Sequence, residues 1–462
     1  MLDTMPVAPV LSPRAGMTIT AAPEGLQVSG VGWERFVPVA EPAVREALLA
    51  LGDFPMSSAE VVSKAVAASG SLAAAVTAQA AIRRLQVMGT YDHVLYEPGD
   101  GILARLTTKG AMAITLTALP DDGATRVLSP LAVATADGGY VTVESGAGPL
   151  AVVLRPDLYA DLVAGRAAQL PQPVLDMLFS ARLWVTEAEL ASRELRQWHP
   201  SDAWFHRRVA ESRGNDGYGG TYHLAADFPP LPYEKPAPGP SVALPVPDLA
   251  RARREDPPLA QVMETRRSHR RYLPGQTTLT QVAELLYRSL RVRQLFPDEA
   301  GLEVVDRPYP SGGSIHEIET YLVVNDVTGL APGIYRYAPT RHELDLVSPD
   351  ERVRSSINAD VQMTTRGELP PPVVLLFGGR FGRVMWKYQG MPYALLTKHV
   401  GVVYQTIYLN ATVLGLGVCG IGGCSAGLFA RATGTDPLDE GAVGMMALGA
   451  PDPTEDDPWR RS

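Results

Sequence analysis

A proline-rich stretch near the middle of the chain constrains the fold more than any other part of the sequence. Residues 228–247 read FPPLPYEKPAPGPSVALPVP and contain eight prolines in twenty positions. Proline has no backbone N–H group and a fixed φ, so this stretch cannot form a helix and gives a sheet few hydrogen-bond donors. The sequence therefore predicts a linker at 228–247, one that can lie along the surface of its neighbours.

Length and charge narrow the class of protein. The chain has 462 residues, of which 46% are hydrophobic, and a formal net charge of −9. A chain of this length buries more than one core, so two or three domains of a soluble globular protein are expected. The acidic balance gives no general attraction to nucleic acid or to an anionic membrane, and neither partner is expected.

The cysteines and the N-terminal sequence predict a cytoplasmic protein. Cys419 and Cys424 are too few for a disulfide framework or a four-ligand zinc site, and they fit a reducing compartment. The first residues lack the basic start and the apolar block of a signal peptide. The apolar run from Tyr393 is interrupted by Lys398 and His399, among others, so it predicts a buried helix and not a membrane span.

The region before the linker resembles a winged helix in its order of elements. Three helical segments are expected within 42–110, the second of which opens with Ser57 and Glu60 as a capping box. Two short strands around Pro-Gly-Asp-Gly then predict a hairpin, the wing. A second, shorter version of the same pattern is expected between 128 and 185.

A winged helix raises the question of DNA binding, which depends on the third helix. That helix carries Arg83 and Arg84 and is otherwise rich in alanine, valine and glutamine. Two cations neutralise too few phosphates for DNA binding. Peptide binding, by addition of a strand to an open edge of the wing, and plain structural support both stay open.

The run METRRSHRRY at 263–272 gathers arginines around a serine. Arg266, Arg267 and Arg270 can bind phosphate oxygens through their guanidinium groups, and Ser268 adds a hydroxyl donor. The alternative is a solvated basic surface with no specific ligand.

The stretch RPYPSGGSIHEIETYLVV at 307–324 begins as a turn and continues as a strand. Pro310, Ser311, Gly312 and Gly313 form the turn, and the two glycines permit close approach of the backbone to a ligand. An ordinary loop is the alternative. No metal site is expected, because HEIET lacks the second histidine of H-E-x-x-H, so His316 is predicted to be packed or hydrogen-bonded.

The segment GLGVCGIGG at 415–423 contains the pattern G-x-G-x-x-G. A dinucleotide-binding fingerprint follows a strand and opens a helix, whereas this pattern follows a long apolar helix, so that function is rejected. The glycines can instead end the helix and place backbone N–H groups against a flat ligand.

The segment GGRFGRVMWKYQGMPY, from 378, supplies a lysine beside a tyrosine. If it is helical, Tyr388 shares an inward face with Phe381 and Val384, and Lys387 lies about 100° away. Lys387 would then lower the pKa of the phenol and make Tyr388 a usable general base. A core tyrosine beside a surface lysine is the alternative.

The order of these segments resembles the FMN-dependent nitroreductase superfamily and, within it, the SagB-type azoline dehydrogenases. These enzymes mature ribosomal peptides that contain thiazoles and oxazoles. The resemblance rests on R-R-S-x-R at 266–270, PSGG with its strand at 310–324, GIYRYAPTRHELDLV at 333–347, Lys387-Tyr388, the glycine segment ending at 423, and the upstream stretch at 198–224.

The resemblance implies an α+β fold and an FMN site. The C-terminal domain would be nitroreductase-like, with a mixed sheet flanked by helices, and it would form a homodimer. Lys387 and Tyr388 would be catalytic. The implied FMN-binding residues are Arg266, Arg267, Ser268, Arg270, Pro310, Ser311, Gly312, Gly313, Ile421, Gly422 and Gly423. A further basic phosphate contact is found only at Arg460 or Arg461 and stays unassigned.

The implied function is oxidation of peptide thiazolines or oxazolines to thiazoles or oxazoles. The partners would be an azoline-containing precursor peptide and the cyclodehydratase that makes the azoline. One alternative is a nitroreductase-like flavoenzyme that consumes NAD(P)H, and another is a non-catalytic peptide-binding adaptor. The expected domains are a winged-helix-like domain at 1–125, a second such region with a connector at 126–227, the linker at 228–247 and the FMN domain at 248–462.

Overall fold

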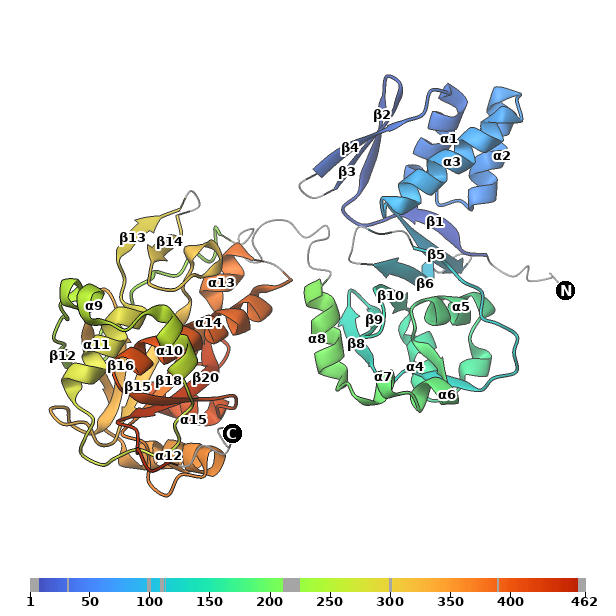
Figure 1. Cartoon of the computed structure of the whole chain (residues 1–462). Coiled ribbons are helices and arrows are strands. Elements are labelled where there is room, and N and C mark those ends of the chain that lie inside the picture. The colour runs from blue at the N-terminus through green and yellow to red at the C-terminus, as the bar shows by residue number, and fades with distance from the viewer. Residues whose placement is uncertain are drawn as a thin grey trace. The chain divides into compact units, whose positions relative to one another are not determined.

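The chain divides into two compact units, 1–217 and 218–462, each of which is described by itself (Figure 1). The computed structural model describes residues 8–30, 33–97, 101–108, 112, 114–210, 225–298, 301–388 and 390–455.

The first part of the N-terminal unit packs a small sheet against three helices. The sheet is antiparallel with the order β2-β3-β4, and its bounds and those of the helices are β2 (Thr18–Ala22), β3 (Gly25–Gly30), β4 (Trp33–Pro38), α1 (Pro42–Asp53), α2 (Ser58–Ser69) and α3 (Ala73–Val87). The predicted capping box is confirmed, because the backbone N–H of Glu60 donates to Ser57 Oγ (3.2 Å) and that of Ser57 donates to Glu60 Oε2 (2.6 Å).

A six-stranded antiparallel sheet forms the rest of the N-terminal unit. Its order is β1-β5-β6-β10-β9-β8, with the bounds β1 (Val10–Pro13), β5 (Tyr91–Glu97), β6 (Gly101–Thr108), β8 (Ala132–Asp137), β9 (Tyr140–Ser145) and β10 (Leu150–Leu154). The other elements are α4 (Pro156–Val163), η1 (Ala167–Gln169), α5 (Gln172–Ser180), α6 (Glu187–Leu190), α7 (Arg193–Arg196), α8 (Pro200–Ala210) and the pair β7 (Arg126–Leu128) and β11 (Trp184–Thr186).

This sheet changes two expectations from the sequence. It runs across the predicted boundary between residues 125 and 126, since β6 pairs with β10, so the two predicted N-terminal regions share one sheet. The predicted wing strands are β5 and β6, and each is paired on both sides. Among the described residues, the outer partners cover residues 91–94 of β5 and 104–108 of β6, so an open edge is left only toward the tip of the hairpin. Assignment of the winged-helix fold itself stays a prediction, and the turn at 98–100 lies outside the described residues.

The C-terminal unit is built on a seven-stranded sheet. Its order is β12-β17-β16-β15-β18-β20-β19, with the bounds β12 (Ser241–Ala243), β15 (Ile318–Val324), β16 (Gly333–Ala338), β17 (Glu343–Ser348), β18 (Val373–Arg380), β19 (Gly417–Ile421) and β20 (Glu440–Gly449). The named strand pairs of this sheet are all antiparallel, so the predicted mixed sheet is wrong for the described residues. A parallel contact is made by the isolated bridge between Ser268 and Val418.

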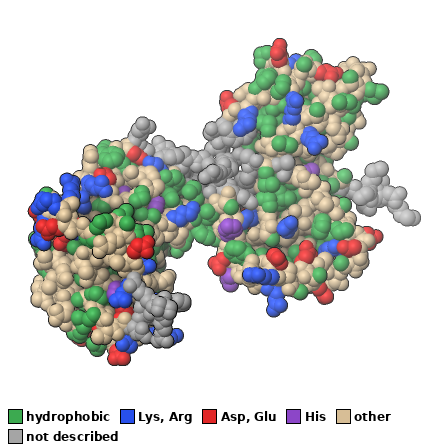
Figure 2. Space-filling model, in the orientation of Figure 1, with side chains coloured by type: hydrophobic (Ala, Val, Ile, Leu, Met, Phe, Trp, Pro, Cys, Tyr) green, Lys and Arg blue, Asp and Glu red, His purple; other side chains and the backbone are tan. Residues whose placement is uncertain are grey.

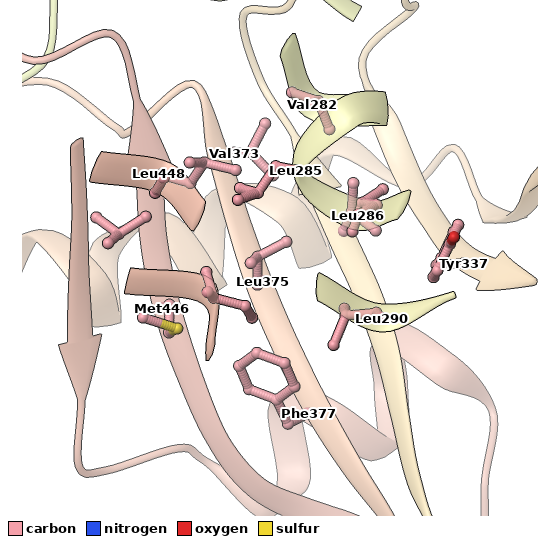
Figure 3. Close-up of a cluster of buried hydrophobic side chains, with 14 of the residues drawn as sticks. Val282, Leu285, Leu286, Leu290, Tyr337, Val373, Leu375, Phe377, Met446 and Leu448 are labelled. Atoms are coloured by element: carbon pink, nitrogen blue, oxygen red, sulfur yellow. The ribbon is translucent and has the colours of Figure 1, made fainter. Parts of the chain in front are cut away.

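Helices cover both faces of this sheet. They are α9 (Leu249–Glu255), α10 (Leu259–Thr265), α11 (Leu279–Leu290), α12 (Glu351–Thr365), α13 (Phe381–Lys387), α14 (Pro392–Val413) and α15 (Ala426–Thr433), accompanied by the hairpin β13 (Gln294–Pro297) and β14 (Glu303–Asp306) and the turn η3 (Gly312–Ser314). Strand β18 shows why both faces are apolar. Leu375 and Phe377 pack with α11 and α14 (Figure 3), whereas Val374 and Leu376 pack with α12 and α15.

The proline-rich segment belongs to the C-terminal unit and is held tightly there. The guanidinium of Arg380 donates to the carbonyl oxygens of Pro232 (2.8 Å) and Tyr233 (2.6 Å), and that of Arg383 donates to Leu231 (2.7 Å). Farther along, β12 adds to the edge of the sheet by pairing with β17. A segment poor in donors is thus bound through its acceptors, and we call 228–247 the proline arm below.

The surface carries local groups of charge. Basic side chains gather over α9 (Figure 2), where Arg251, Arg253 and Arg254 are exposed. Arg251 pairs with Glu255 (2.7 Å), which is an ordinary i,i+4 pair on a solvated helix. Among the described residues, no helix combines the length and the apolar character needed to cross a membrane, and α14 is a core helix.

Candidate active site

A buried histidine and a buried glutamate hold the turn at 310–313, which is predicted to lie along a flavin. The backbone N–H of Gly312 donates to Nε2 of His399 (2.7 Å), and Nδ1 of the same ring lies 2.7 Å from Oε1 of Glu317. Because Nε2 accepts, the ring proton is on Nδ1 and is donated to Glu317. Ser311 Oγ accepts the N–H of His316 (3.1 Å). The turn is therefore held in one conformation.

Lys387 lies against this turn, although it is far away in the sequence. Gly313 has a φ of +60°, in the left-handed region, and a Cβ built there would lie 2.9 Å from Lys387 Cε. The ammonium of Lys387 lies 3.6 Å from Oδ2 of Asp298, whose Oδ1 accepts the N–H of Leu302 (2.9 Å). The fold thus brings a predicted catalytic residue onto the predicted flavin turn.

Tyr388 does not continue the inward helical face that the sequence predicts. Helix α13 ends at Lys387, and Tyr388 follows it with an extended backbone (φ −121°, ψ 141°). The inward face is filled by Trp386 and by Arg383, which donates to the carbonyl oxygens of residues 231, 303 and 315. Tyr388 packs, half-buried, against the cluster of Leu302, Val304, Ile315 and Trp386.

The arginine segment meets the glycine segment through one tyrosine of α14. The hydroxyl of Tyr408 accepts the N–H of Gly420 (2.7 Å) and lies 2.9 Å from Ser268 Oγ, to which it can donate. The guanidinium carbon of Arg266 lies 5.2 Å from the centroid of the same ring. Ser268 also forms the parallel bridge with Val418 in β19. These contacts place 266–268 beside 418–420.

The other two predicted phosphate-binding arginines lie close by in sequence but have different surroundings. Arg267 donates from Nε to Nε2 of His269 (3.2 Å). Arg270 is exposed and lines a cavity of about 130 Å³ with Arg271 and Asp452, while its backbone N–H donates to Glu455 (2.9 Å). Arg460 and Arg461 lie outside the described residues.

The glycine segment presents open backbone to solvent. Ile421 is buried, and its carbonyl accepts the hydroxyl of Tyr404 (3.0 Å). Gly422 and Gly423 are exposed, and a Cβ built on either would meet nothing within 4 Å. By contrast, Gly417 lies within β19, so the G-x-G-x-x-G pattern does not open a helix. The open pair suits a flat ligand, as predicted, without a side chain in its way.

The predicted residues form two groups on opposite sides of α14. One group contains the turn at 310–313 with Lys387, held by His399, and the other contains 266–268 with 420–423, held by Tyr404 and Tyr408. His399 and Tyr408 are nine residues apart, which corresponds to a rotation of about 180° and a rise of about 13 Å along a helix. Among the described residues, no hydrogen bond or ion pair links residues 310–313 or Lys387 to residues 266–268 or 420–423.

Sequence reasoning missed the residues that organise both groups. His399, Tyr404 and Tyr408 recur along the largely apolar helix α14, and that recurrence indicates hydrogen-bonding positions within it. Of the three, His399 alone entered the sequence analysis, as one of the polar residues that argue against a membrane span. Among the described residues, no cluster of His, Cys, Asp and Glu side chains could hold a metal ion.

The chemistry of the second group fits FMN. Arg266 and Arg267 supply guanidinium donors and Ser268 a hydroxyl for a phosphate, and exposed backbone at 422–423 can lie against an aromatic ring system. Residues 263–450 match the nitroreductase family. The C-terminal unit contains a nitroreductase family domain. Members of this family are oxidoreductases that bind FMN.

Two relatives share sequence with this domain. A protein of Methanocaldococcus jannaschii named as a nitroreductase, MJ1384, is 28% identical over 187 residues, which are 40% of this chain and 85% of that protein. The trifolitoxin-processing protein TfxB of Rhizobium leguminosarum bv. trifolii is 26% identical over 147 residues. That match covers 31% of this chain and 39% of TfxB.

Solved structures of low similarity also match. The E. coli microcin synthetase McbBCD complex with truncated pro-MccB17 bound contains a chain that is 20% identical, with a TM-score of 0.34, covering 50% of this chain and 82% of its own. A Desulfovibrio desulfuricans protein named as a nitroreductase, in complex with FMN, is 18% identical with a TM-score of 0.29, covering 45% and 93%.

Proposed function

We propose that this chain is an FMN-dependent dehydrogenase that oxidises thiazoline or oxazoline rings of a peptide to thiazoles or oxazoles. The observation that carries the proposal is the position of Lys387, which lies over Gly313 of the flavin turn with Tyr388 next to it. A plain nitroreductase needs no such pair. The similarity to TfxB, a protein named for toxin processing, supports a peptide substrate.

The residues of this chain would act in three ways. Arg266, Arg267 and Ser268 bind the phosphate of FMN, with Arg270 in reach of the same segment. The backbone of 310–313 and of 421–423, where Gly422 and Gly423 leave open space, would hold the ring system. FMN, held by these residues, would supply the acceptor for the hydride from the β carbon of the azoline, with oxygen as the final oxidant.

Tyr388 is the proposed general base. It takes the proton from the α carbon, and the product ring becomes aromatic. Lys387 stabilises the phenolate, and Asp298 holds the Lys387 ammonium in place at 3.6 Å. Loss of one proton and one hydride accounts for the two hydrogens that separate an azoline from an azole.

Two copies of the chain would complete each site. The turn group and the arginine group lie on opposite sides of α14, and each ligand would contact the turn group of one copy and the arginine group of the other. A homodimer is therefore part of the proposal. The other partners are the azoline-containing precursor peptide and the cyclodehydratase that makes it, and the two free thiols, Cys419 and Cys424, fit the cytoplasm.

The test replaces each catalytic residue in the flavin-loaded protein. Lys387→Ala and Tyr388→Phe should each lower the rate of two-hydrogen mass loss from an azoline peptide by roughly 10²- to 10⁴-fold. The absorbance of bound FMN should not change. Lys64→Ala, an exposed lysine of the other unit, is the control and should oxidise normally. Normal oxidation by both catalytic variants would refute the assignment.

The closest alternative is an enzyme that reduces an external acceptor with NAD(P)H. The similarity to MJ1384, which covers most of that protein, favours it. Rapid reduction of the bound flavin by NADPH without peptide would identify this activity. A protein that binds no FMN at saturating supply would instead be the peptide-binding adaptor.

A further inference from the structure

The hairpin of β13 and β14 forms a two-stranded sheet of its own, apart from the seven-stranded sheet of the C-terminal unit (Figure 1). Strand β14 is anchored on several sides. The carbonyl of Glu303 accepts the guanidinium of Arg383 in α13, and its carboxylate accepts the backbone N–H of Tyr233 (2.6 Å). Strand β14 also contacts η3, which is part of the turn at 310–313. The hairpin is therefore fixed to the candidate active site through β14.

Strand β13, by contrast, is exposed. Its only strand partner among the described residues is β14, and it carries two large apolar side chains, Leu295 and Phe296, that are each 40% exposed. Exposure alone says little, because single apolar side chains are common on protein surfaces. The two side chains differ in what shares their face of the hairpin.

The pairing register places Phe296 on the face of the predicted catalytic tyrosine. Phe296 lies opposite Val304, and Leu295 lies opposite Val305. Opposite residues of an antiparallel pair project to the same face, and neighbours along a strand project to opposite faces. Val304 belongs to the buried cluster against which Tyr388 packs. Phe296 therefore shares a face with that cluster, and Leu295 lies on the other face.

The end of the same strand reaches the predicted catalytic lysine. The N–H of Asp298 donates to the carbonyl of Leu302 (2.8 Å), so the pairing continues past Phe296, and Asp298 lies on the same face two residues farther along. Its Oδ2 lies 3.6 Å from the ammonium of Lys387. Two residues of an extended chain span roughly 7 Å. A peptide whose ring lies at Lys387 thus brings the residues next to the ring within reach of Phe296.

We propose that Phe296 determines substrate specificity by packing against an apolar side chain within two positions of the azoline ring. The identity of that ring rests on the proposed function. An apolar side chain gains from leaving water against the phenyl ring, whereas an amide side chain would lose its hydrogen bonds to water and find no partner there. Recognition is through side chains, because Pro297 leaves this short strand with one N–H fewer for an added strand.

The test uses the flavin-loaded full chain and two synthetic pentapeptides with a central thiazoline, flanked on both sides by leucines or by glutamines. We expect kcat/KM to be at least roughly tenfold higher for the leucine peptide. Phe296→Ala should remove this preference by raising KM for the leucine peptide without a change in kcat. Leu295→Ala, equally exposed on the other face of the same strand, is the matched control and should retain the preference.

Two further variants separate specificity from damage to the hairpin. Phe296→Trp keeps an aromatic surface and should keep the leucine preference. Phe296→Lys should favour a third peptide flanked by glutamates over the leucine peptide. FMN content and the thermal midpoint should match those of the wild-type protein in each variant. A leucine preference that survives in Phe296→Ala, or an equal loss for the leucine and glutamine peptides, overturns the proposal. So does dissociation of the dimer by Phe296→Ala with an unchanged preference.

Failure of this proposal can be distinguished from failure of the proposed function. Isothermal titration calorimetry with the corresponding thiazole peptides measures the same contact without turnover. If the wild-type protein oxidises neither thiazoline peptide but binds the leucine thiazole peptide more tightly, and Phe296→Ala removes that difference, only the proposed function is refuted. If the wild-type protein oxidises the leucine and glutamine peptides equally well, only the role of Phe296 is refuted.

Discussion

At the scale of single residues, His316 shows how burial decides the state of a titratable group. It has a φ of +47°, packs edge-on against Tyr309 with ring centroids 4.8 Å apart, and is buried. Its Nδ1 has no hydrogen-bond partner among the described residues. The prediction that this histidine is packed is confirmed. Burial lowers the pKa of His316 to about 2, so the folded protein holds it neutral.

This burial makes the C-terminal unit sensitive to acid. The unfolded chain takes up a proton on His316 below about pH 6.5 and the folded chain does not, so the free energy of unfolding falls as the pH drops from 6.5 toward 2. The slope from this group is at most about 1.4 kcal/mol per pH unit. Urea unfolding from pH 7 to pH 4 should show a shallower loss in His316→Asn, since asparagine tolerates a positive φ. Equal slopes in both proteins would contradict the prediction.

At the scale of elements, the proline arm is bound by arginines that reach its carbonyl oxygens. Arg383 is fully buried and donates to three carbonyl groups, one of them in the arm at Leu231. Burial lowers the pKa of Arg383 to about 10. The two Nη groups of Arg383 are satisfied by these carbonyl oxygens, whereas its buried Nε has no partner among the described residues, and the arm is held through its acceptors.

Loss of this arginine should free the arm. Arg383→Met leaves three carbonyl groups, those of the buried Ile315 and of two partly buried residues, without their donor, which we expect to lower the free energy of unfolding by about 2–4 kcal/mol. Limited proteolysis followed by mass spectrometry should then detect cuts within 228–247. Arg253→Met, on the exposed surface of α9, is the control and should stay resistant. An uncut arm in a destabilised Arg383→Met protein would mean that other contacts are sufficient to hold it.

Sequence patterns predicted elements whose cause is local. The capping box at Ser57 and the long buried helix at 392–413 follow from hydrogen-bonding side chains and apolar periodicity within one segment. The arm, the end of α13 at Lys387 and the pairing of the wing strands depend on distant partners. Those partners are backbone carbonyls and strand edges, which no local sequence pattern indicates. The sequence therefore predicted the site residues as separate segments, and not as two groups around α14.

At the scale of the whole molecule, the division of the site decides how many chains a working enzyme needs. Helix α14 separates the turn group, with Gly313 and Lys387, from the arginine group, with Arg266 and Ser268. If each FMN contacts the turn group of one copy and the arginine group of the other, a lone chain has two half-sites and no complete one. The stability of the fold and the enzymatic activity would then depend on the protein concentration in different ways.

Mixed dimers test this arrangement directly. We expect Arg266→Ala/Ser268→Ala and Lys387→Ala to be inactive as separate proteins, the first through loss of FMN and the second through loss of catalysis. The two variants are then co-expressed with different tags and purified as a mixed dimer. Because each site takes one group from each copy, one site of the mixed dimer carries both defects and the other site carries none. The mixed dimer should therefore recover roughly half of the wild-type rate of azoline oxidation per dimer, with roughly half of its FMN. If instead both groups of one chain formed a site, every site in the mixed dimer would carry a defect, and no activity would return.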